Sequence, residues 1–316
     1  AAAATTFDGY PLAQKGEAGR ALGIAVISST VGGIFSVLIL CFAAPLLARV
    51  AYEFRSPEYF ALTVFGLSML ASISAGGAVK NLIGGIFGVW LSTIGAERVT
   101  GIERFMFGNY ELYEGLHFVP IFIGLFAISE LLVQSKTVDK IIKTVSMKAV
   151  KLPTLEDYKK IWKTILRSCG IGTFIGVLPA EGATVASMIG YSEARRWSKN
   201  KKEFGKGSIE GIAGAEAANN AATGGAMVPT MVLGIPGSGT TAIILVGLMV
   251  HGLRPGVYLF TEQVEKVYQI FGSMFVANVM FMLMGLYAAK LFARVSLVPT
   301  QILWPIVFAL SVIGAY

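Results

Sequence analysis

The sequence predicts an all-α polytopic membrane protein, with two pseudo-symmetric repeats that contain re-entrant helical hairpins or broken helices. Hydrophobic residues make up 54% of the 316 residues and charged residues only 14%, whereas soluble domains are about 25% charged. The charges gather in blocks and leave long charge-free runs, and roughly 20 apolar residues suffice to cross a bilayer core. In addition, Ala48-Arg49-Val50 recurs as Ala293-Arg294-Val295, which indicates an internal repeat.

Charge-free runs in the first part of the chain predict its membrane segments. Ala21–Leu47 is long enough to cross with some tilt, and Tyr59–Val79 and Leu116–Gln134 are two further spans. Asn81–Gly95 is short and rich in glycine, so it either crosses the membrane or only dips into it. We assign residues 1–135 to the remainder of a first repeat.

The charged segments between these runs predict the orientation of the chain. Lys136–Arg167 carries nine cations against three carboxylates, and Arg195–Lys206 carries six cations and one glutamate. Glu97–Glu114, in contrast, has four glutamates and two arginines. The positive-inside rule therefore predicts that 136–167 is a basic cytoplasmic connection. The net charge of +7 reflects such loops, and we expect no nucleic-acid partner.

Residues 168–192 lie between two cytoplasmic segments and must cross the membrane an even number of times. These 25 residues are too few for two full spans, which need roughly 40. Pro179 and Gly182 interrupt the segment, so we predict a re-entrant hairpin with Glu181 at its tip. Glu181 is either a proton or cation site, together with Gly182 and Thr184, or a carboxylate that reaches water.

The longest charge-free run, Ala217–Leu253, has 37 residues. A single helix of that length would extend about 55 Å, which is too long for one span. Gly224-Gly225, Pro229 and GIPGSG interrupt it. We therefore predict a broken element over residues 208–253, within a second repeat that covers 168–316.

The stretch GIPGSGTT, Gly234–Thr241, lacks one residue of a phosphate-binding loop, because Thr240 replaces the lysine. No strand is expected before it, so a nucleotide site is disfavoured. The pattern instead favours a break between half-helices. Its N–H groups and the hydroxyls of Ser238, Thr240 and Thr241 are suited to bind an anion at a positive helix end. A glycine-rich packing bend is the alternative.

Glu216, Asn219 and Asn220 lie within one and a half turns of the apolar helix predicted before this break. Adjacent asparagines are costly in lipid unless they are paired, so they face either a cavity or another helix. Glu216 is a second candidate for a proton or cation site. Hydrogen bonding between packed helices is the alternative for the asparagines.

Other chemistry has less support. Cys41 and Cys169 lie in apolar surroundings, and we expect no metal centre beyond a possible Na⁺ site. An intramembrane enzyme that uses Glu181 and Glu216 as an acid/base pair is one alternative function, although the sequence contains no nucleophile–base set. A passive channel is another.

The repeat suggests that the chain is part of a longer protein. The counterpart of GIPGSGTT in the first copy would fall just before Ala1, and the second copy runs past Tyr316. We therefore expect a fragment that lacks both ends of a protein with two homologous halves, an organisation common among secondary transporters.

Residues Leu178–Leu245, from LPAEGAT to GIPGSGTTAIIL, closely resemble the signature region of the large membrane subunit of the tripartite tricarboxylate transporter family. Thr5–Gly23 resembles the motif of its first half, and the resemblance extends over essentially the whole chain. One departure is PAEG at Pro179–Gly182, where PGAG is common in the family.

The resemblance implies a multi-pass carrier of the bacterial inner membrane that imports citrate-like di- and tricarboxylates, driven by a Na⁺ or H⁺ gradient and without a cofactor. It also implies two partners, a small four-helix membrane subunit and a periplasmic solute-binding protein. The predicted substrate-binding residues are motif positions and their neighbours: Asn219, Asn220, Pro236, Gly237, Ser238, Gly239, Thr240 and Thr241 in the second half, and Thr5, Thr6 and Asp8 in the first. Gly9 and Tyr10 are further motif positions of the first half.

Overall fold

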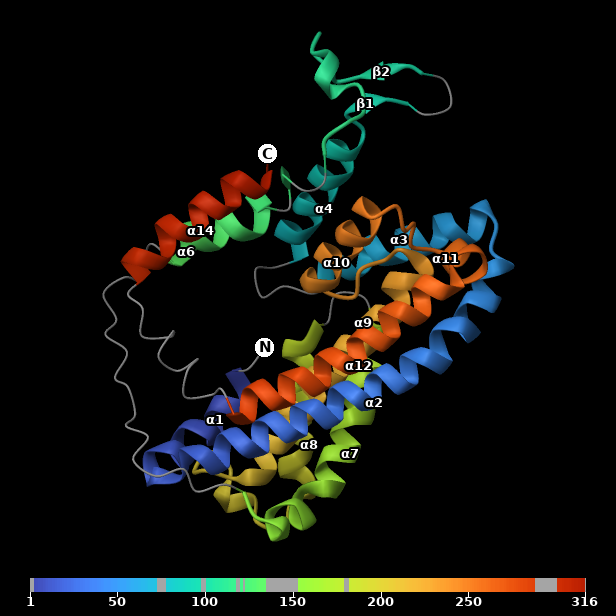
Figure 1. The fold of residues 1–316 in the computed structure, drawn as a ribbon. Coiled ribbons are helices and arrows are strands. Elements are labelled where there is room, and N and C mark those ends of the chain that lie inside the picture. Colours follow the sequence, from blue (N-terminus) through green and yellow to red (C-terminus); the bar gives the residue numbers. More distant parts are fainter. Residues whose placement is uncertain are drawn as a thin grey trace. The chain divides into compact units, whose positions relative to one another are not determined.

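The computed structural model describes residues 3–72, 78–97, 101–117, 120–121, 123–134, 153–178, 182–287 and 300–315. The chain forms two compact units, one from Ala1–Phe60 and Thr144–Phe292, the other from Ala61–Lys143 and Ala293–Tyr316. Most described residues are helical (Figure 1), as the sequence predicts for an all-α membrane protein.

The first unit contains α1 (Ala3–Leu12), the π-helical turn η1 (Ala13–Glu17), α2 (Ala18–Tyr52), α7 (Leu155–Val177), α8 (Gly182–Trp197), the 3-10 turn η5 (Lys201–Glu203), α9 (Ile209–Leu233), α10 (Gly239–Val250), α11 (Val257–Glu262) and α12 (Val264–Tyr287). The second unit contains α4 (Ala78–Ser92), β1 (Gly95–Ala96), β2 (Glu103–Arg104), η2 (Tyr110–Leu112), η3 (Ile123–Ile128), α6 (Ser129–Gln134) and α14 (Thr300–Ala315). Helix α3 (Ser56–Ser72) begins in the first unit and continues into the second.

Helix α9 is the centre of the first unit, and α2, α7 and α8 all pack along it. Small residues make this close packing possible. A Cβ on Gly172 of α7 would overlap the carbonyl oxygen of Ala218, and one on Gly176 would overlap that of Ala222. Gly32 of α2 makes the same kind of approach to the carbonyl oxygen of Ala217. The backbones are therefore too close for any larger side chain.

Helices α2 and α12 lie side by side at the front of Figure 1, and their contacts show that they are antiparallel. Gly285, near the end of α12, faces Val26 near the start of α2, whereas Phe271 of α12 packs in the cluster that contains Leu40 and Ala48. This cluster is the larger apolar core of the unit and also includes Met231 of α9.

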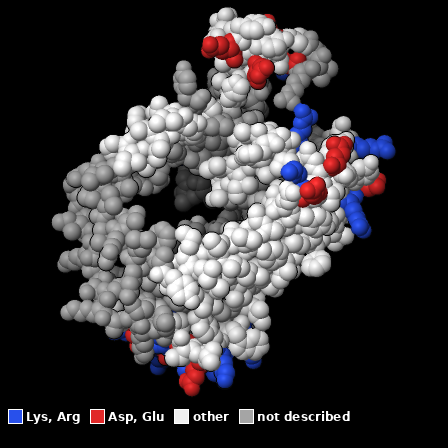
Figure 2. Space-filling model, viewed as in Figure 1, with Lys and Arg blue, Asp and Glu red and all other residues white. Residues whose placement is uncertain are grey.

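Two helical stretches in the described part of the chain are long and apolar enough to cross a membrane, Ala3–Tyr52 and Val264–Tyr287. Figure 2 shows charged side chains gathered near the two ends of the α2–α12 pair, and an uncharged face between them. A wide apolar surface bounded by charges is typical of a protein in a bilayer. Together with the helical content, this supports a membrane protein.

The second unit contains a feature that the charge pattern did not predict, a short antiparallel pair of β1 and β2. Gly95 pairs with Arg104, and Ala96 pairs with Glu103. Elsewhere in this unit α14 packs against η3, where a Cβ on Gly314 would lie 3.6 Å from Ile123.

The helix α7 starts earlier than the charge pattern indicates. It begins at Leu155, inside the segment predicted as a cytoplasmic connection, because Thr154 and Asp157 form a capping box. The Thr154 N–H donates to Asp157 Oδ2 over 2.9 Å, and the Asp157 N–H donates to Thr154 Oγ1 over 3.3 Å. This Thr-x-x-Asp signal is readable in the sequence.

The predicted interruptions of residues 208–253 differ in their effect. Helix α9 continues through Gly224-Gly225 and Pro229 and ends at Leu233. Gly234 then takes a left-handed conformation, with φ 69°, and α10 begins at Gly239. Proline is tolerated inside a helix where neighbouring groups satisfy the freed carbonyl or packing holds the helix. The break therefore lies at GIPGS alone.

A second interruption separates α7 from α8, between Leu178 and Gly182, so the expected hairpin segment consists of two packed helices. Re-entry of this pair into a membrane stays a prediction, as do the two-fold repeat and the division into residues 1–135, 136–167 and 168–316.

Candidate functional site

The break between α9 and α10 is held by hydrogen bonds to its own neighbours. The N–H groups of Gly234 and Ile235 both donate to the Pro229 carbonyl, and the Gly237 N–H donates to Thr230 Oγ1 over 3.3 Å. A Cβ on Gly237 would lie 2.8 Å from the Cβ of Ala226, so only glycine fits there without a shift. Pro236 lies between these anchored residues and is half-buried.

Ser238 and Thr241 close the start of α10 with a capping box. The Thr241 N–H donates to Ser238 Oγ over 3.2 Å, and the Ser238 N–H donates to Thr241 Oγ1 over 2.8 Å. Thr240 and Gly239 are exposed at this end. The first N–H groups of a helix have no intrahelical partner, so Gly239 and Thr240 present donors at the positive end of α10.

Gly182, at the start of α8, lies beside this break. A Cβ built on Gly182 would be 3.9 Å from the Cβ of Ser238, and the residue has a positive φ of 62° that favours glycine. The two interruptions of the chain therefore come together in the first unit. Thr184 is exposed one half-turn further on. Glu181, the predicted tip residue, lies outside the described residues.

A polar stripe runs along the middle of α9. From Gly211 to Val232 every residue is buried except the four members of this stripe: Glu216, Asn219, Asn220 and Thr223. Their spacing is i, i+3, i+4 and i+7, so they share one face of the helix. Thr223 is exposed and extends the predicted set toward the break.

Asn220 joins three helices through its amide. Its Nδ2 donates to the Ser29 carbonyl of α2 over 2.8 Å and to Asn278 Oδ1 of α12 over 3.0 Å. Gly33 leaves the space for this pair, because a Cβ there would overlap Asn278. The amide nitrogen of Asn220 therefore makes the hydrogen bonds between helices that were predicted as the alternative to a cavity-facing role. The amide oxygen of Asn220 instead lies 3.5 Å from Thr223 Oγ1, within the polar stripe.

Glu216 lies one turn before this amide pair. Thr5 of α1 donates its hydroxyl to Glu216 Oε1 over 2.7 Å, which brings a predicted first-half residue onto the stripe. Asn219 is half-buried between the two contacts. A carboxylate, two amides and hydroxyls in this arrangement can bind a proton or a small cation, since they supply oxygen ligands without a fixed positive charge.

Asp8 lies elsewhere. It is fully buried, and its Oδ1 accepts the N–H groups of Gly207 and Ser208, both over 2.8 Å, at the start of α9. Thr6 is exposed and donates to the Ala3 carbonyl, and Gly9 and Tyr10 continue the same helix. At 1.5 Å per residue, the start of α9 is roughly 39 Å from the break. One carboxylate substrate therefore cannot contact both ends in this conformation.

Asn278, Ser29 and Gly33 were not among the residues predicted for the site. Asn278 interrupts an apolar run of α12, and an asparagine in such a run is a signal of interhelical pairing. Ser29 and Gly33 occur in SSTVGG of α2, whose small residues permit close helix packing. Among the described residues, no group of three or more His, Cys, Asp and Glu side chains is placed to hold a metal ion.

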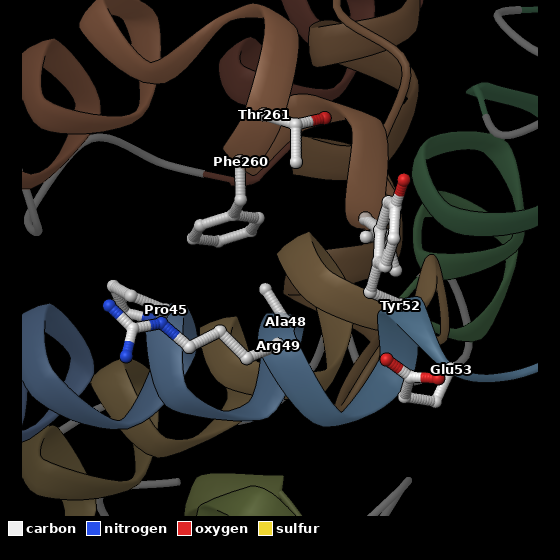
Figure 3. A pocket seen from close by; sticks show the side chains of 8 residues that line it. Pro45, Ala48, Arg49, Tyr52, Glu53, Phe260 and Thr261 are labelled. Atoms are coloured by element: carbon white, nitrogen blue, oxygen red, sulfur yellow. The ribbon is translucent and has the colours of Figure 1, made fainter.

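A cavity of about 500 Å³ lies at the far end of α2 (Figure 3). Arg49 and Pro45 of α2 face Phe260 of α11 across it, and Tyr52 closes one side. Arg49 belongs to the repeated Ala-Arg-Val sequence. The cavity is lined by Arg49 and Glu53 together, so it is not a purely anionic or cationic site.

The family model described as "Tripartite tricarboxylate transporter TctA family" matches residues 1–316. A protein of Agrobacterium vitis, named "Uncharacterized 52.8 kDa protein in TAR-I ttuC' 3'region", is 37% identical over 316 residues, which is 99% of this chain and 62% of that protein. A second protein of the same organism, "Uncharacterized protein in TAR-II ttuC' 3'region", is 36% identical over 145 residues, 46% of this chain and 60% of its own length. The chain thus spans less than two thirds of either relative. No solved structure matches.

Proposed function

The chain belongs to the tripartite tricarboxylate transporter TctA family, and on that premise we propose that it carries di- or tricarboxylates such as citrate across the bacterial inner membrane as part of a multi-pass secondary transporter. The family is a transporter family and not an enzyme family, so the acid/base pair of Glu181 and Glu216 is set aside. The observation that carries the proposal is the α9–α10 break, which offers uncharged donors beside the α7–α8 interruption.

In this proposal the substrate carboxylate binds at the start of α10. Gly239 and Thr240 are exposed there, while Ser238 and Thr241 are occupied by the cap. N–H groups at a helix start bind anions through the aligned peptide dipoles. Because no lysine or arginine is present from Ala217 to Leu253, the anion is held without a fixed charge and can be released.

The polar stripe of α9 is the proposed site of the coupling ion. Glu216 is the one carboxylate between Gly211 and Leu233, and it accepts from Thr5. Ionisable groups at such positions in membrane proteins commonly belong to ion or proton pathways. Na⁺ and H⁺ are both compatible with this set of oxygen atoms. Gly182, Thr184 and Glu181 stay candidates for a second contribution from the hairpin.

The transport cycle follows from the two interruptions. Movement of the α7–α8 pair against α9 would change the contact between Gly182 and Ser238, and so expose the α10 start to one side of the membrane at a time. We propose that a periplasmic solute-binding protein delivers the substrate and that a small four-helix membrane subunit completes the carrier, with import driven by the ion gradient.

The test measures uptake of labelled citrate and related carboxylates by the full-length protein and its partner subunits in vesicles. Thr240→Ala should raise KM by roughly 10- to 100-fold, because a hydroxyl–carboxylate hydrogen bond contributes roughly 1.5–3 kcal/mol. Glu216→Gln should reduce the dependence of uptake on pH or on Na⁺. Ser273→Ala is the matched control, since this exposed hydroxyl of α12 bonds only its own helix.

Three outcomes contradict the proposal. Wild-type KM in Thr240→Ala removes the α10 start as the substrate site. An unchanged ion dependence in Glu216→Gln removes the stripe as the coupling site. Substrate flux that is independent of any ion gradient would indicate a passive channel instead of an ion-coupled carrier.

A further inference from the structure

A basic cavity of about 650 Å³ lies at the end of the first unit where α9 begins. It is bounded by the start of α2, the first half of α7, the segment after α8 and the first residues of α9. Its charged lining consists of five cations and two carboxylates: Arg20, Lys160, Lys163, Arg167, Lys199, Glu203 and Glu210. This excess of positive charge plays no part in the proposed transport site.

Three of the cations are on one face of α7. Lys160, Lys163 and Arg167 are spaced i, i+3 and i+7, and Thr164 lies between them on the same face. The helix thus places two lysines, an arginine and a threonine along one cavity, with the Lys163 ammonium 5.5 Å from the centre of the Trp162 ring. Lys199 adds a cation from the segment that follows α8.

Internal ion pairs do not account for these α7 cations. Arg20 is the paired member of the lining, with its Nη2 2.6 Å from Asp157 Oδ1 and its Nη1 2.7 Å from Glu17 Oε2. The guanidinium lowers the pKa of Asp157 to about 2, so the pair stays ionised at neutral pH. Of the two carboxylates in the lining, Glu210 accepts the hydroxyl hydrogen of Ser198.

Arg167 gives the second, independent indication of a ligand. Its guanidinium lies 4.8 Å from the centre of the Trp197 ring. Its Nη1 is buried and has no hydrogen-bond partner. A guanidinium with an unpaired buried N–H is costly, so an anion in the cavity beside Arg167 would offset this cost.

The surroundings of the cavity indicate where that anion comes from. Trp197 lines the cavity and is exposed, and α7 carries the exposed apolar side chains of Leu166 and Phe174 further along the helix. Tryptophan next to a basic rim and an apolar flank is typical of the membrane–water interface. A soluble anion would make no contact with the apolar side chains of Leu166 and Phe174, whereas the acyl chains of a lipid would pack against them.

We propose that this cavity binds the phosphate of an anionic membrane lipid at the membrane surface on the side of the basic segments. The headgroup phosphate accepts from Arg167, Lys160 and Lys163, and the acyl chains lie along Leu166 and Phe174. Basic pockets between helices at the cytoplasmic surface are suited to such headgroups. The site is separate from the proposed carrier mechanism and does not depend on it.

The experiment measures the melting temperature of the full-length protein with increasing phosphatidylglycerol, and separately with phosphatidylcholine. Phosphatidylglycerol should stabilise the wild type by several degrees more than phosphatidylcholine does. In Lys163→Gln/Lys199→Gln the half-saturating lipid fraction should rise roughly tenfold or more, since each basic side chain near an anionic surface contributes about 1 kcal/mol. Both side chains are exposed, so the variant should fold.

Lys201→Gln/Lys202→Gln is the matched control, because it removes the same charge at exposed positions of the basic segment that contains Lys199 but does not touch the cavity lining. It should keep the wild-type lipid response, and Arg167→Gln should lose it. Equal stabilisation by both lipids overturns the proposal. If the control pair loses as much of the phosphatidylglycerol response as Lys163→Gln/Lys199→Gln does, the proposal is also overturned. The lipid would then be attracted by the basic surface in general and not by the cavity. Stabilisation by free glycerol phosphate alone would assign the cavity to a soluble phosphate ester.

Discussion

At its start, α9 is held by a buried carboxylate, whereas at its far end it meets the next helix through glycines and hydroxyls. Asp8 accepts the N–H groups of Gly207 and Ser208 at the start. At the other end Gly234 closes α9, and Ser238 caps α10. The first residues of α9, Ile209 and Glu210, are half-buried, whereas the first residues of α10, Gly239 and Thr240, are exposed and present their N–H donors.

The difference indicates which end can bind a ligand. The start of α9 is closed by two internal side chains, because Asp8 accepts the N–H groups of Gly207 and Ser208, and Ser208 Oγ accepts the Gly211 N–H over 3.3 Å. An end that is capped by hydroxyls and keeps its first N–H groups in the open can accept an anion without losing its own structure. Stability should therefore depend mainly on the first end, and transport mainly on the second.

The largest effect is expected from Asp8→Ala. It leaves the buried Ser208 N–H and the partly buried Gly207 N–H without acceptors, and the loss at a buried group costs roughly 1–3 kcal/mol. The free energy of unfolding should fall by about 3 kcal/mol, as measured by denaturant unfolding in detergent. Thr6→Ala, which removes an exposed hydroxyl of the same helix, should change it little. An equal loss in both variants would mean that Asp8 does not hold the start of α9.

The middle of α9, which joins the two ends, can be tested at two glycines of α7. Gly172→Ala should cost about 2 kcal/mol, within the usual range for overpacking, because the new methyl group overlaps the Ala218 carbonyl. A Cβ on Gly170 would meet no atom of another element within 4 Å, so Gly170→Ala should be neutral or stabilise the helix by up to about 1 kcal/mol. The same unfolding measurement compares the two, and a similar effect at both glycines would contradict the close packing.

The smallest effect on stability is expected at the second end. Ser238→Ala removes one half of the α10 cap and should cost about 1 kcal/mol. Thr240→Ala should leave the unfolding free energy unchanged, because its exposed side chain makes no contact in the cap, and should act on transport alone. If Thr240→Ala lowers the unfolding free energy as much as Ser238→Ala does, Thr240 is part of the helix cap and not a residue reserved for the substrate.

Several features were predictable from local sequence. The break at GIPGS and the interruption before Gly182 depend on Gly234 and Gly182, which have a positive φ. The sequence shows that both residues are glycines, the residue type that adopts this conformation most easily. The stripe spacing of Glu216, Asn219 and Asn220 was also visible. The start of α7 was missed because the basic residues were interpreted as a loop, although Thr154 and Asp157 carry a capping signal.

Composition and spacing alone established the membrane class, the break at GIPGS and the uncharged character of the α9–α10 junction, because all three follow from residues close together in the chain. They did not show that α9 continues through Gly224-Gly225 and Pro229, which only its packing decides. Which polar groups are already engaged depends on folding. Asn220 pairs with Asn278, 58 residues away, and Asp8 closes a helix 200 residues away. No local pattern specifies such partners, since they meet only when the helices pack, and this packing separates the groups that support the fold from those left for a ligand.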